Sequence, residues 1–342
     1  MKYSWIWPGR PEPAEEGGLL TPPLTAATLS TVEWSQRLGA GDPRALARAL
    51  TLVESGGPGA DGLSTWVRAG QRGAHRIGVT GAPGSGKSSL VDRLIASYRE
   101  RGARVGVLAV DPTSPYTGGA ILGDRVRMMS HHDDAGVFIR SLATRGALGG
   151  LSRSTWRAAD LLDAAGYDPI IVETVGVGQS EVDVAELADT TILVLTPNAG
   201  DAVQTFKAGV MEIADVFAVN KGDLPEAGTV VREVLALLAL APERDGWRFP
   251  VLTTIATSGT GVDDLAATIA RHREHLRASG LERRVRERRI RRMLLSALHG
   301  RVEARLASSA GALVLQRYLD GEIDENEAAN LLGFSPEPAP CG

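Results

Sequence analysis

One stretch of the chain has the residue types and the spacing needed to hold a chain of phosphates. The residues GAPGSGKSS fit the pattern GxxxxGK[ST] at every fixed position. In such a turn the glycines let backbone amides converge on phosphate oxygens, and the helix that follows adds the positive end of its dipole. We therefore expect a nucleotide to be bound by the turn residues Gly81, Ala82, Pro83, Gly84, Ser85, Gly86, Lys87, Ser88 and Ser89.

Two side chains of this turn have more specific roles in phosphoryl chemistry. Lys87 is placed to neutralise charge on the β- and γ-phosphates, and Ser88 is placed to give its hydroxyl to Mg²⁺. A glycine-rich turn can also arise by chance. Here the apolar run RIGVT precedes the turn and the helix-like LVDRLIASYRE follows it, which is the strand, turn and helix order that the motif requires.

Three carboxylates lie where a metal ion beside the phosphates would need them. Glu173 ends the apolar run PIIVET, Asp111 ends RVGVLAVD, and Asp124 lies in GGAILGDRVRM. Because carboxylates can hold Mg²⁺ directly or through water, we predict that Ser88, Asp111, Asp124 and Glu173 serve the metal and hydrolysis. The alternatives are a buried strand-end carboxylate for Glu173 and a turn or helix cap for each aspartate.

Hydrolysis also needs a well-placed water molecule, because the transition state of phosphoryl transfer is loose and positioning matters more than deprotonation. The amide of Gly176 can meet the γ-phosphate. Gln179 can help to hold the water, although its place beside Ser180 suits a helix cap equally. Lys207 reaches the γ-phosphate only if its loop folds inward, and the residues alone favour a solvated surface lysine.

The segment VFAVNKGD predicts which base is bound. It places Asn220, Lys221 and Asp223 after an apolar strand, at the edge where doubly wound sheets collect ligand-binding loops. The Asp223 carboxylate can accept hydrogen bonds from N1–H and the 2-amino group of guanine, a pair that adenine lacks, so we predict GTP and GDP as ligands. The alternative is an Asn/Asp-rich helix start. In TTIATSGTGVDDL, the backbone amide of Ala256 is the candidate partner of guanine O6.

The elements that must position these residues are short apolar strands that alternate with helical stretches over residues 75–278. Several strands are apolar at consecutive positions, as expected when helices cover both faces of a sheet. We predict an α/β fold with a doubly wound, mostly parallel sheet of the P-loop NTPase type. The expected strands are RIGVTG, RVGVLAVD, GVFIRS, PIIVET, TTILVLT, VFAVN and PVLTTIA.

Two segments precede this region. Residues 1–40 are rich in Pro, Gly and Glu, and we interpret them as a poorly ordered or loosely packed arm. Residues 41–74 are expected to be helical, since DPRALARALTLVES offers Asp42 as an N-cap and Pro43 at the first helical position.

The C-terminal part, residues 279–342, is expected to be helical without strands. Ile290, Leu294 and Leu298 recur every four positions among many arginines. This pattern is typical of an amphipathic helix with a solvated basic face, and a dimer arm or partner-docking helix is the alternative. Nucleic-acid binding is not predicted, because no aromatic residues are interleaved to stack on bases. A last helix is expected over DENEAANLLGF.

Composition limits the classes of protein that remain. The chain has 342 residues, of which 43% are hydrophobic and 23% charged. This composition is close to that of soluble globular proteins and argues against a disordered or fibrous protein. A formal net charge of −4 gives no general attraction to nucleic acid or to an anionic membrane. The lone cysteine, Cys341, cannot form an internal disulfide, and no apolar segment is long enough to span a bilayer, so we expect a cytoplasmic protein.

Six segments occur in an order that resembles the MeaB/ArgK-type GTPases. This family is related to the metallochaperone P-loop GTPases, and its members are chaperones of methylmalonyl-CoA mutase. The resemblance covers roughly residues 42–334, and residues 111–128 are the part most specific to the family. The segments are GAPGSGKSS, DPTSPYTGGAILGDRVRM, ETVGVGQSE, GDAVQTFKAG, VNKGD and YLDGEIDENEAA.

The resemblance implies a homodimeric GTPase that docks on an adenosylcobalamin-dependent mutase, gates delivery of its cofactor, and protects or rescues it from inactivation. It implies that the C-terminal helices are the dimerisation arm. It also implies that residues 197–207 are the mobile segment that couples nucleotide state to the partner, which strengthens a role for Lys207 in hydrolysis. Two departures from the family pattern are Ile255, where Ser is common, and the variant loop sequence PNAGD.

Three other functions fit parts of the sequence. A nickel metallochaperone GTPase would need a Cys/His ligand cluster, whereas the chain has one cysteine and six histidines, of which only His131 and His132 are adjacent. A small-molecule kinase would need a pocket for a phosphate acceptor, and none is identified. A nucleotide-gated binding module with negligible turnover of its own is the third alternative.

Overall fold

The computed structural model describes most of the chain between helix α1 and the end of helix α13. Residues 1–30, which make up most of the predicted N-terminal arm, lie outside this description. The described residues are 31–55, 60–111, 129–131, 133–143, 153–174, 180–197, 210–240 and 243–334.

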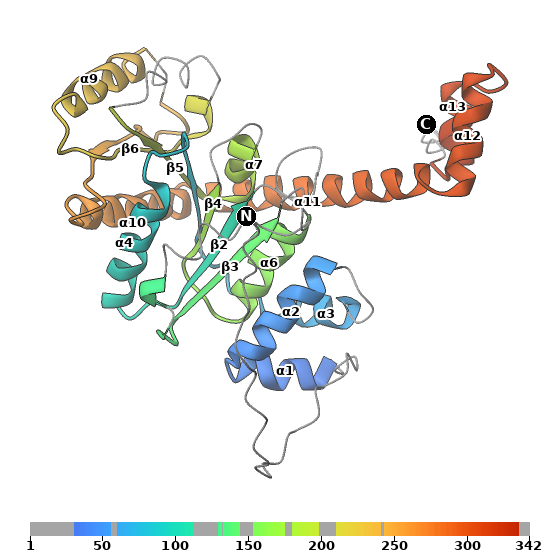
Figure 1. Cartoon of the computed structure of the whole chain (residues 1–342), viewed down its shortest axis with the longest axis horizontal. Coiled ribbons are helices and arrows are strands. Elements are labelled where there is room, and N and C mark those ends of the chain that lie inside the picture. Colours follow the sequence, from blue (N-terminus) through green and yellow to red (C-terminus); the bar gives the residue numbers. More distant parts are fainter. Residues whose placement is uncertain are drawn as a thin grey trace, which may run out of the picture.

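The centre of the molecule is a seven-stranded sheet in the order β3-β2-β4-β1-β5-β6-β7. All neighbouring strands pair in parallel, and each of the seven predicted apolar runs supplies one strand. The sequence prediction of a doubly wound parallel sheet is therefore confirmed (Figure 1). The strands are β1 (Arg76–Thr80), β2 (Val105–Asp111), β3 (Val137–Ala143), β4 (Ile170–Thr174), β5 (Thr190–Leu195), β6 (Val216–Val219) and β7 (Val251–Thr253).

Helices cover both faces of this sheet, and alternate strand residues point to each. Ile77, Val79 and Ile192 pack against α4 and α10 on one face, whereas Leu108 and Val172 pack against α6 and α7 on the other. Burial of both faces explains why the strand sequences are apolar at consecutive positions. The helices are α4 (Lys87–Glu100), α6 (Arg153–Ala164), α7 (Ser180–Leu187), α9 (Ala227–Leu238) and α10 (Val262–Ala278), with the short turns η1 (Met129–His131) and η2 (Val210–Ile213).

Helices α2 (Pro43–Ser55) and α3 (Ala60–Gly70) pack on α6, and α1 (Thr31–Gly39) packs on α2 and α3. Asp42 caps α2 as predicted, because its Oδ1 accepts from the amides of Arg44 at 2.9 Å and Ala45 at 3.2 Å. The prediction of a loosely packed arm up to residue 40 is wrong for residues 31–39. Trp34 and Leu38 of α1 are each 2% exposed and belong to the core, so burial of these two large side chains fixes a helix that composition did not indicate.

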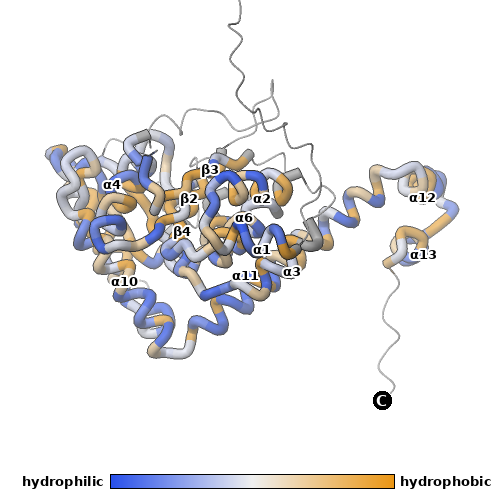
Figure 2. Tube along the Cα trace, turned by 90° about the horizontal axis from the view of Figure 1, so that it is seen from below, coloured by the Kyte–Doolittle hydropathy of each residue, from blue (hydrophilic) through white to orange (hydrophobic). Residues whose placement is uncertain are grey.

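The C-terminal part is helical, as predicted, and stands away from the body (Figures 1 and 2). Helix α11 (Leu281–Leu306) starts on the body and carries α12 (Ser309–Leu319) and α13 (Glu325–Leu331) at its far end. None of its 26 residues is buried, so the helix is not part of the core of this chain. Within the described residues, no helix is both long and apolar enough to cross a membrane.

Candidate functional site

The glycine-rich turn follows β1, the central strand, and its shape depends on two glycines. Gly81 has φ 139°, and a Cβ there would lie 2.2 Å from the carbonyl oxygen of Val194 in β5. Gly86 has φ 90°, and a Cβ there would lie 2.3 Å from Nδ2 of Asn220. No side chain fits at either position, so the motif glycines are required by close approach of neighbouring strands and loops as well as by the phosphate chemistry.

Lys87 is the first residue of α4, and its side chain folds back over the turn. Its Nζ donates to the carbonyl oxygen of Gly81 at 2.7 Å and to that of Ala82 at 3.0 Å. The residue is only 6% exposed. The turn therefore holds a positive charge on its inner side, close to the backbone amides that are expected to receive phosphate oxygens.

Ser88 and Glu173 are brought together from different elements, as the sequence predicted for a metal site. Strand β4 pairs in parallel with β1, with Glu173 opposite Val79, so the carboxylate ends beside the start of α4. The Ser88 hydroxyl donates to Glu173 Oε1 at 2.6 Å, and both residues are buried. A hydroxyl and a carboxylate at this distance supply the oxygen ligands that Mg²⁺ prefers, so the residues present fit that ion.

Asn220, which follows β6, connects the phosphate turn to the loop after β7. Its Nδ2 donates to the carbonyl oxygen of Ser85 at 2.9 Å. Its Oδ1 accepts from the Ala256 amide at 3.1 Å and from the Thr254 hydroxyl at 3.3 Å. The predicted phosphate residues and the predicted O6 partner thus meet at one buried side chain. In this structure the Ala256 amide donates to Asn220 rather than facing an open surface.

The remaining base-reading residues lie on a tight turn after β6. Lys221 has φ 58°, in the left-handed region that a lysine rarely adopts. A Cβ on Gly222 would lie 2.3 Å from Cγ2 of Thr253, so only glycine fits at that position. Asp223 is exposed in this turn, which follows Asn220 at the carboxyl end of β6, and its role in reading the base stays a prediction.

Arg93 of α4 is a residue of this site that the sequence reasoning missed. Its Nε donates to the carbonyl oxygen of Ala256 at 3.1 Å and its Nη2 to that of Thr257 at 2.7 Å. These bonds join the helix of the phosphate turn to the predicted O6 loop. In the helical segment LVDRLIASYRE, an arginine is expected to be solvated. The neighbouring residues do not indicate a partner more than a hundred residues away.

Several predicted residues cannot be placed in this geometry. Asp111 ends β2, next to β4 in the sheet, but its side chain lies outside the described residues. Asp124, Gly176 and Lys207 lie outside them entirely, and so do Gln179 and residues 198–209 of the predicted mobile segment. Their roles stay predictions. Among the residues that are described, no group of three or more His, Cys, Asp or Glu side chains is arranged to hold a metal ion.

Comparison with known proteins agrees with this geometry. The family model described as methylmalonyl Co-A mutase-associated GTPase MeaB matches residues 46–310. A protein of Pyrococcus horikoshii named as a GTPase is 46% identical over 305 residues, which cover 88% of this chain and 96% of that protein. The GTPase ArgK of Escherichia coli is 40% identical over 272 residues, covering 77% of this chain and 82% of that protein.

A solved structure supports the same fold. The crystal structure of a protein described as an LAO/AO transport system kinase superposes with a TM-score of 0.67 at 29% sequence identity. The match covers 91% of this chain and 98% of that one. The two chains therefore share their overall fold over nearly their full lengths.

Proposed function

Because the chain belongs to the family of methylmalonyl Co-A mutase-associated GTPases described as MeaB, and is itself a GTPase, we propose that its nucleotide cycle serves an adenosylcobalamin-dependent acyl-CoA mutase. It gates delivery of the mutase cofactor and protects or reactivates the mutase. The family match over residues 46–310 carries the proposal of this partner. A cytoplasmic location and the lack of nucleic-acid or membrane partners stay predictions from composition.

In the proposed GTPase site, each part of the nucleotide has its own residues. The turn amides and Lys87 hold the phosphates, and Asn220 and Asp223 select guanine. Mg²⁺ is held by Ser88 with Glu173, either directly or through water, and supplies charge neutralisation at the phosphates. The supporting observation is the 2.6 Å contact between the Ser88 hydroxyl and Glu173, because it aligns two oxygen ligands beside Lys87.

The metal assignment can be tested by titrating Mg²⁺ during GTP hydrolysis. Glu173→Gln keeps the size of the side chain and removes its charge, so half-maximal turnover should need at least tenfold more Mg²⁺. Glu100→Gln, an exposed substitution at the end of α4, is the matched control and should keep the parental requirement. An unchanged requirement in Glu173→Gln would remove this carboxylate from the metal site.

A homodimer formed through α11, α12 and α13 is part of this proposal. The arm displays large apolar side chains to solvent: Leu313 is 63% exposed, Leu319 is 79% exposed and Leu298 is 50% exposed. Several large apolar side chains left exposed on one arm support an interaction site there. Light scattering should report a dimer for the parent and a monomer for Leu313→Glu/Leu319→Glu. Leu240→Glu, at a residue that is 85% exposed beyond α9, is the control that should stay dimeric.

The proposed partnership is tested with purified components. A methylmalonyl-CoA mutase is mixed with this chain, and the affinity of the complex is measured with GDP and with a non-hydrolysable GTP analogue. We expect complex formation that changes with the nucleotide, and faster GTP hydrolysis when the mutase is added. Absence of a complex with either nucleotide would reject the partnership and leave the GTPase assignment standing.

The name of the superposed relative, a transport system kinase, favours one second function, transfer of phosphate to a small molecule. The two functions differ in the product. With γ-³²P-labelled GTP, a GTPase releases all label as inorganic phosphate, whereas a kinase places label on an organic acceptor. We expect inorganic phosphate only.

A further inference from the structure

A cavity lies at the end of the sheet opposite the phosphate turn. It has a volume of about 540 Å³ and is enclosed by α2, α3, α6 and the first half of α11. Arg76, the first residue of β1, forms part of its wall, whereas Gly81 follows the last residue of the same strand. The cavity is therefore separate from the proposed nucleotide site and independent of the proposed mutase partnership.

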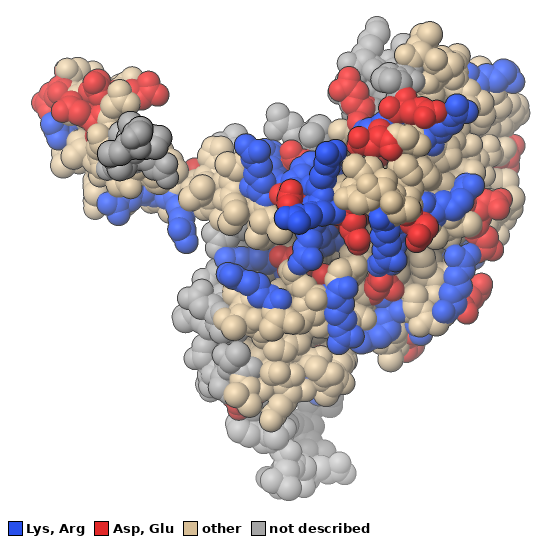
Figure 3. Space-filling model, turned by 180° about the vertical axis from the view of Figure 1, so that it is seen from behind, with Lys and Arg blue, Asp and Glu red and all other residues tan. Residues whose placement is uncertain are grey.

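The wall of the cavity combines apolar and cationic side chains. Leu63, Val67, Trp156 and Met293 are among its apolar residues. Its charged residues are five arginines and one carboxylate, namely Arg68, Arg76, Arg157, Arg286, Arg289 and Asp160. Figure 3 shows Lys and Arg side chains gathered where the arm joins the body. This local excess of positive charge contrasts with the net charge of −4 of the whole chain.

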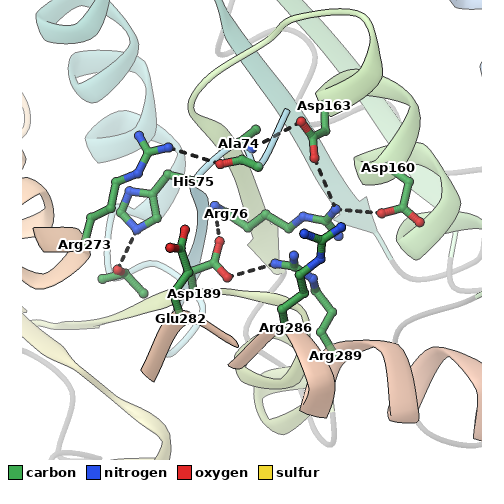
Figure 4. Close-up of polar contacts among 12 residues, drawn as sticks. Ala74, His75, Arg76, Asp160, Asp163, Asp189, Arg273, Glu282, Arg286 and Arg289 are labelled. Atoms are coloured by element: carbon green, nitrogen blue, oxygen red, sulfur yellow. Dashed lines mark hydrogen bonds and ion pairs between the residues drawn. The ribbon is translucent and has the colours of Figure 1, made fainter. Parts of the chain in front are cut away.

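Carboxylates compensate only part of this charge. Arg76 pairs with Asp160 at 2.6 Å, and Arg289 pairs with Asp189 at 2.8 Å. Figure 4 shows the guanidinium groups of Arg76, Arg286 and Arg289 close to one another. Burial lowers the pKa of Arg289, and the charge of Arg76 lowers it further, which shows that the cations repel each other.

Two of the arginines that line the cavity have no carboxylate partner in the described part of the chain. Arg286 donates only to a neutral acceptor, Gln71 Oε1, at 3.3 Å. Arg68 forms no ion pair with any described residue. Both side chains line the cavity while remaining exposed, so an anion that enters can reach them without breaking an existing salt bridge.

Arg76 provides an independent indication of a missing acceptor. The residue is 2% exposed, and its Nε is buried without a hydrogen-bond partner among the described residues. A buried guanidinium donor is normally satisfied by protein or by a ligand. Its place in the wall of a cavity with other arginines indicates that a ligand acceptor completes the set.

We propose that this cavity binds a small amphipathic anion. Its carboxylate or phosphate head is held by Arg68, Arg286 and Arg76, and its apolar body packs against Trp156 and Met293. The volume lies in the range of small-molecule sites, in which apolar walls hold the body and a few polar groups fix the orientation. A bound ligand contacts both α11, which is the base of the arm, and β1, which leads to the phosphate turn.

The test is calorimetry on the full-length chain saturated with Mg²⁺ and GDP, so that the phosphate turn is already occupied. The probes are octyl phosphate, octanoate, octanol and inorganic phosphate. We expect one of the two amphipathic anions to bind, and the tighter one identifies the head group. The proposal would be overturned if octanol or inorganic phosphate bound as tightly as the tighter of the two amphipathic anions. It would also be overturned if neither octyl phosphate nor octanoate bound.

Variants locate the binding. Arg68→Gln/Arg286→Gln should weaken the tighter probe at least tenfold, since two charge-assisted contacts are lost. Val67→Trp should abolish binding by filling the apolar part. Arg284→Gln is the matched control, because it lies on the same helix and does not line the cavity, and it should bind as the parent does. GDP affinity checks that each variant is folded, and equal probe binding by the folded double variant would reject this cavity as the site.

Discussion

The two ends of the central sheet carry polar groups of different kinds. At the carboxyl end, Lys87 and Asn220 bind mainly backbone atoms of neighbouring loops, such as the carbonyl oxygens of Gly81 and Ser85. At the amino end, Arg76 and Asp189 bind side chains of opposite charge from other elements. Bonds to backbone atoms can be exchanged for bonds to a ligand, whereas the ion pairs of the amino end also connect elements of the fold.

Three shifted pKa values belong to one polar network at the amino end. Burial lowers the pKa of His75 and of His272 to about 3, and it raises the pKa of Asp215 to about 6. Both histidines contact the Thr190 hydroxyl at 2.8 Å. Perturbed pKa values often indicate a catalytic site, but here they follow from burial of a polar network beneath the strands, far from the proposed chemistry.

The largest effect is expected from breaking a charge pair at the amino end. Arg76→Met leaves Asp160 and Asp163 without their buried partner, so the free energy of unfolding should fall by about 3–5 kcal/mol. Urea denaturation measures this change. Arg248→Met, which removes a surface pair with Glu243, is the control and should leave the midpoint unchanged. Equal midpoints for both variants would contradict a structural role for the amino-end charges.

The next effect concerns catalysis at the carboxyl end. Lys87→Ala should reduce GTP hydrolysis by about a hundredfold to a thousandfold, because one electrostatic contact to the transition state is lost. Its free energy of unfolding should stay near that of the parent. Phosphate release and urea denaturation measure the two quantities, with Glu100→Ala as the control. Full turnover by Lys87→Ala would show that the phosphate site is wrongly assigned.

Base selection at the same end should show a similar or slightly smaller effect. Asp223→Asn should weaken GTP binding about a hundredfold and favour xanthosine nucleotides, since two hydrogen bonds to a charged acceptor are lost. Calorimetry measures both affinities, and Glu226→Gln, an exposed residue at the start of α9, is the control. Equal affinity of the parent chain for ATP and GTP would contradict guanine selection.

Lowering the pH should destabilise the fold through the buried histidines at the amino end of the sheet. The folded pKa of His75 and of His272 lies below the usual 6.5, so the stability from their neutral forms is present above pH 6.5 and is lost as the pH falls toward 3. Protonation of Asp215, whose pKa is raised, opposes part of this loss below pH 6. Between pH 7 and pH 5 we expect a net loss of about 2 kcal/mol of unfolding free energy.

A substitution separates the histidine contribution. His272→Asn retains a polar side chain near Thr190 and removes one titrating group, so the loss between pH 7 and pH 5 should become clearly smaller. Denaturation at several pH values measures it, and an identical pH dependence in variant and parent would exclude His272 as a cause.

The smallest effect is expected at the link between the phosphate and base loops. Arg93→Ala removes the bonds to the carbonyl oxygens of Ala256 and Thr257, so GTP affinity should fall by about fivefold, consistent with loss of one or two partly exposed hydrogen bonds. Arg93→Lys keeps the positive charge but loses the forked geometry of the guanidinium group, so its GTP affinity should lie between that of the parent and that of Arg93→Ala. GTP affinity equal to that of the parent in Arg93→Ala would show that the loop holds its position without this residue.

Sequence reasoning succeeded where neighbouring residues determine the outcome. The strand that begins at Arg76, the glycine-rich turn after it, and the Asp42 cap each depend on a few consecutive residues. Ser88 and Glu173 were each predicted to serve Mg²⁺, which stays a prediction. The structure brings their side chains together because they follow or end strands whose carboxyl ends meet in a parallel sheet.

Features that depend on distant partners were missed. The segment TVEWSQRLG is polar overall, and only contact with the core shows that Trp34 and Leu38 hold it as a helix. Arginines such as Arg93 and Arg76 are usually expected to be solvated, but in the structure each binds a partner far along the chain. Such pairings depend on how the helices and strands assemble, and the local sequence around each residue does not specify that assembly.

Helix α11 has a mechanical consequence. Its 26 residues correspond to a rod of about 39 Å, at 1.5 Å per residue. Near its start the rod is fastened to the body by Arg289 on Asp189 and by Arg292 on Glu186 of α7. The far end of the rod lies about 26 Å beyond Arg289, so a tilt of about 5° at these ion pairs moves that end by about 2 Å, and the arm magnifies small rotations of the body.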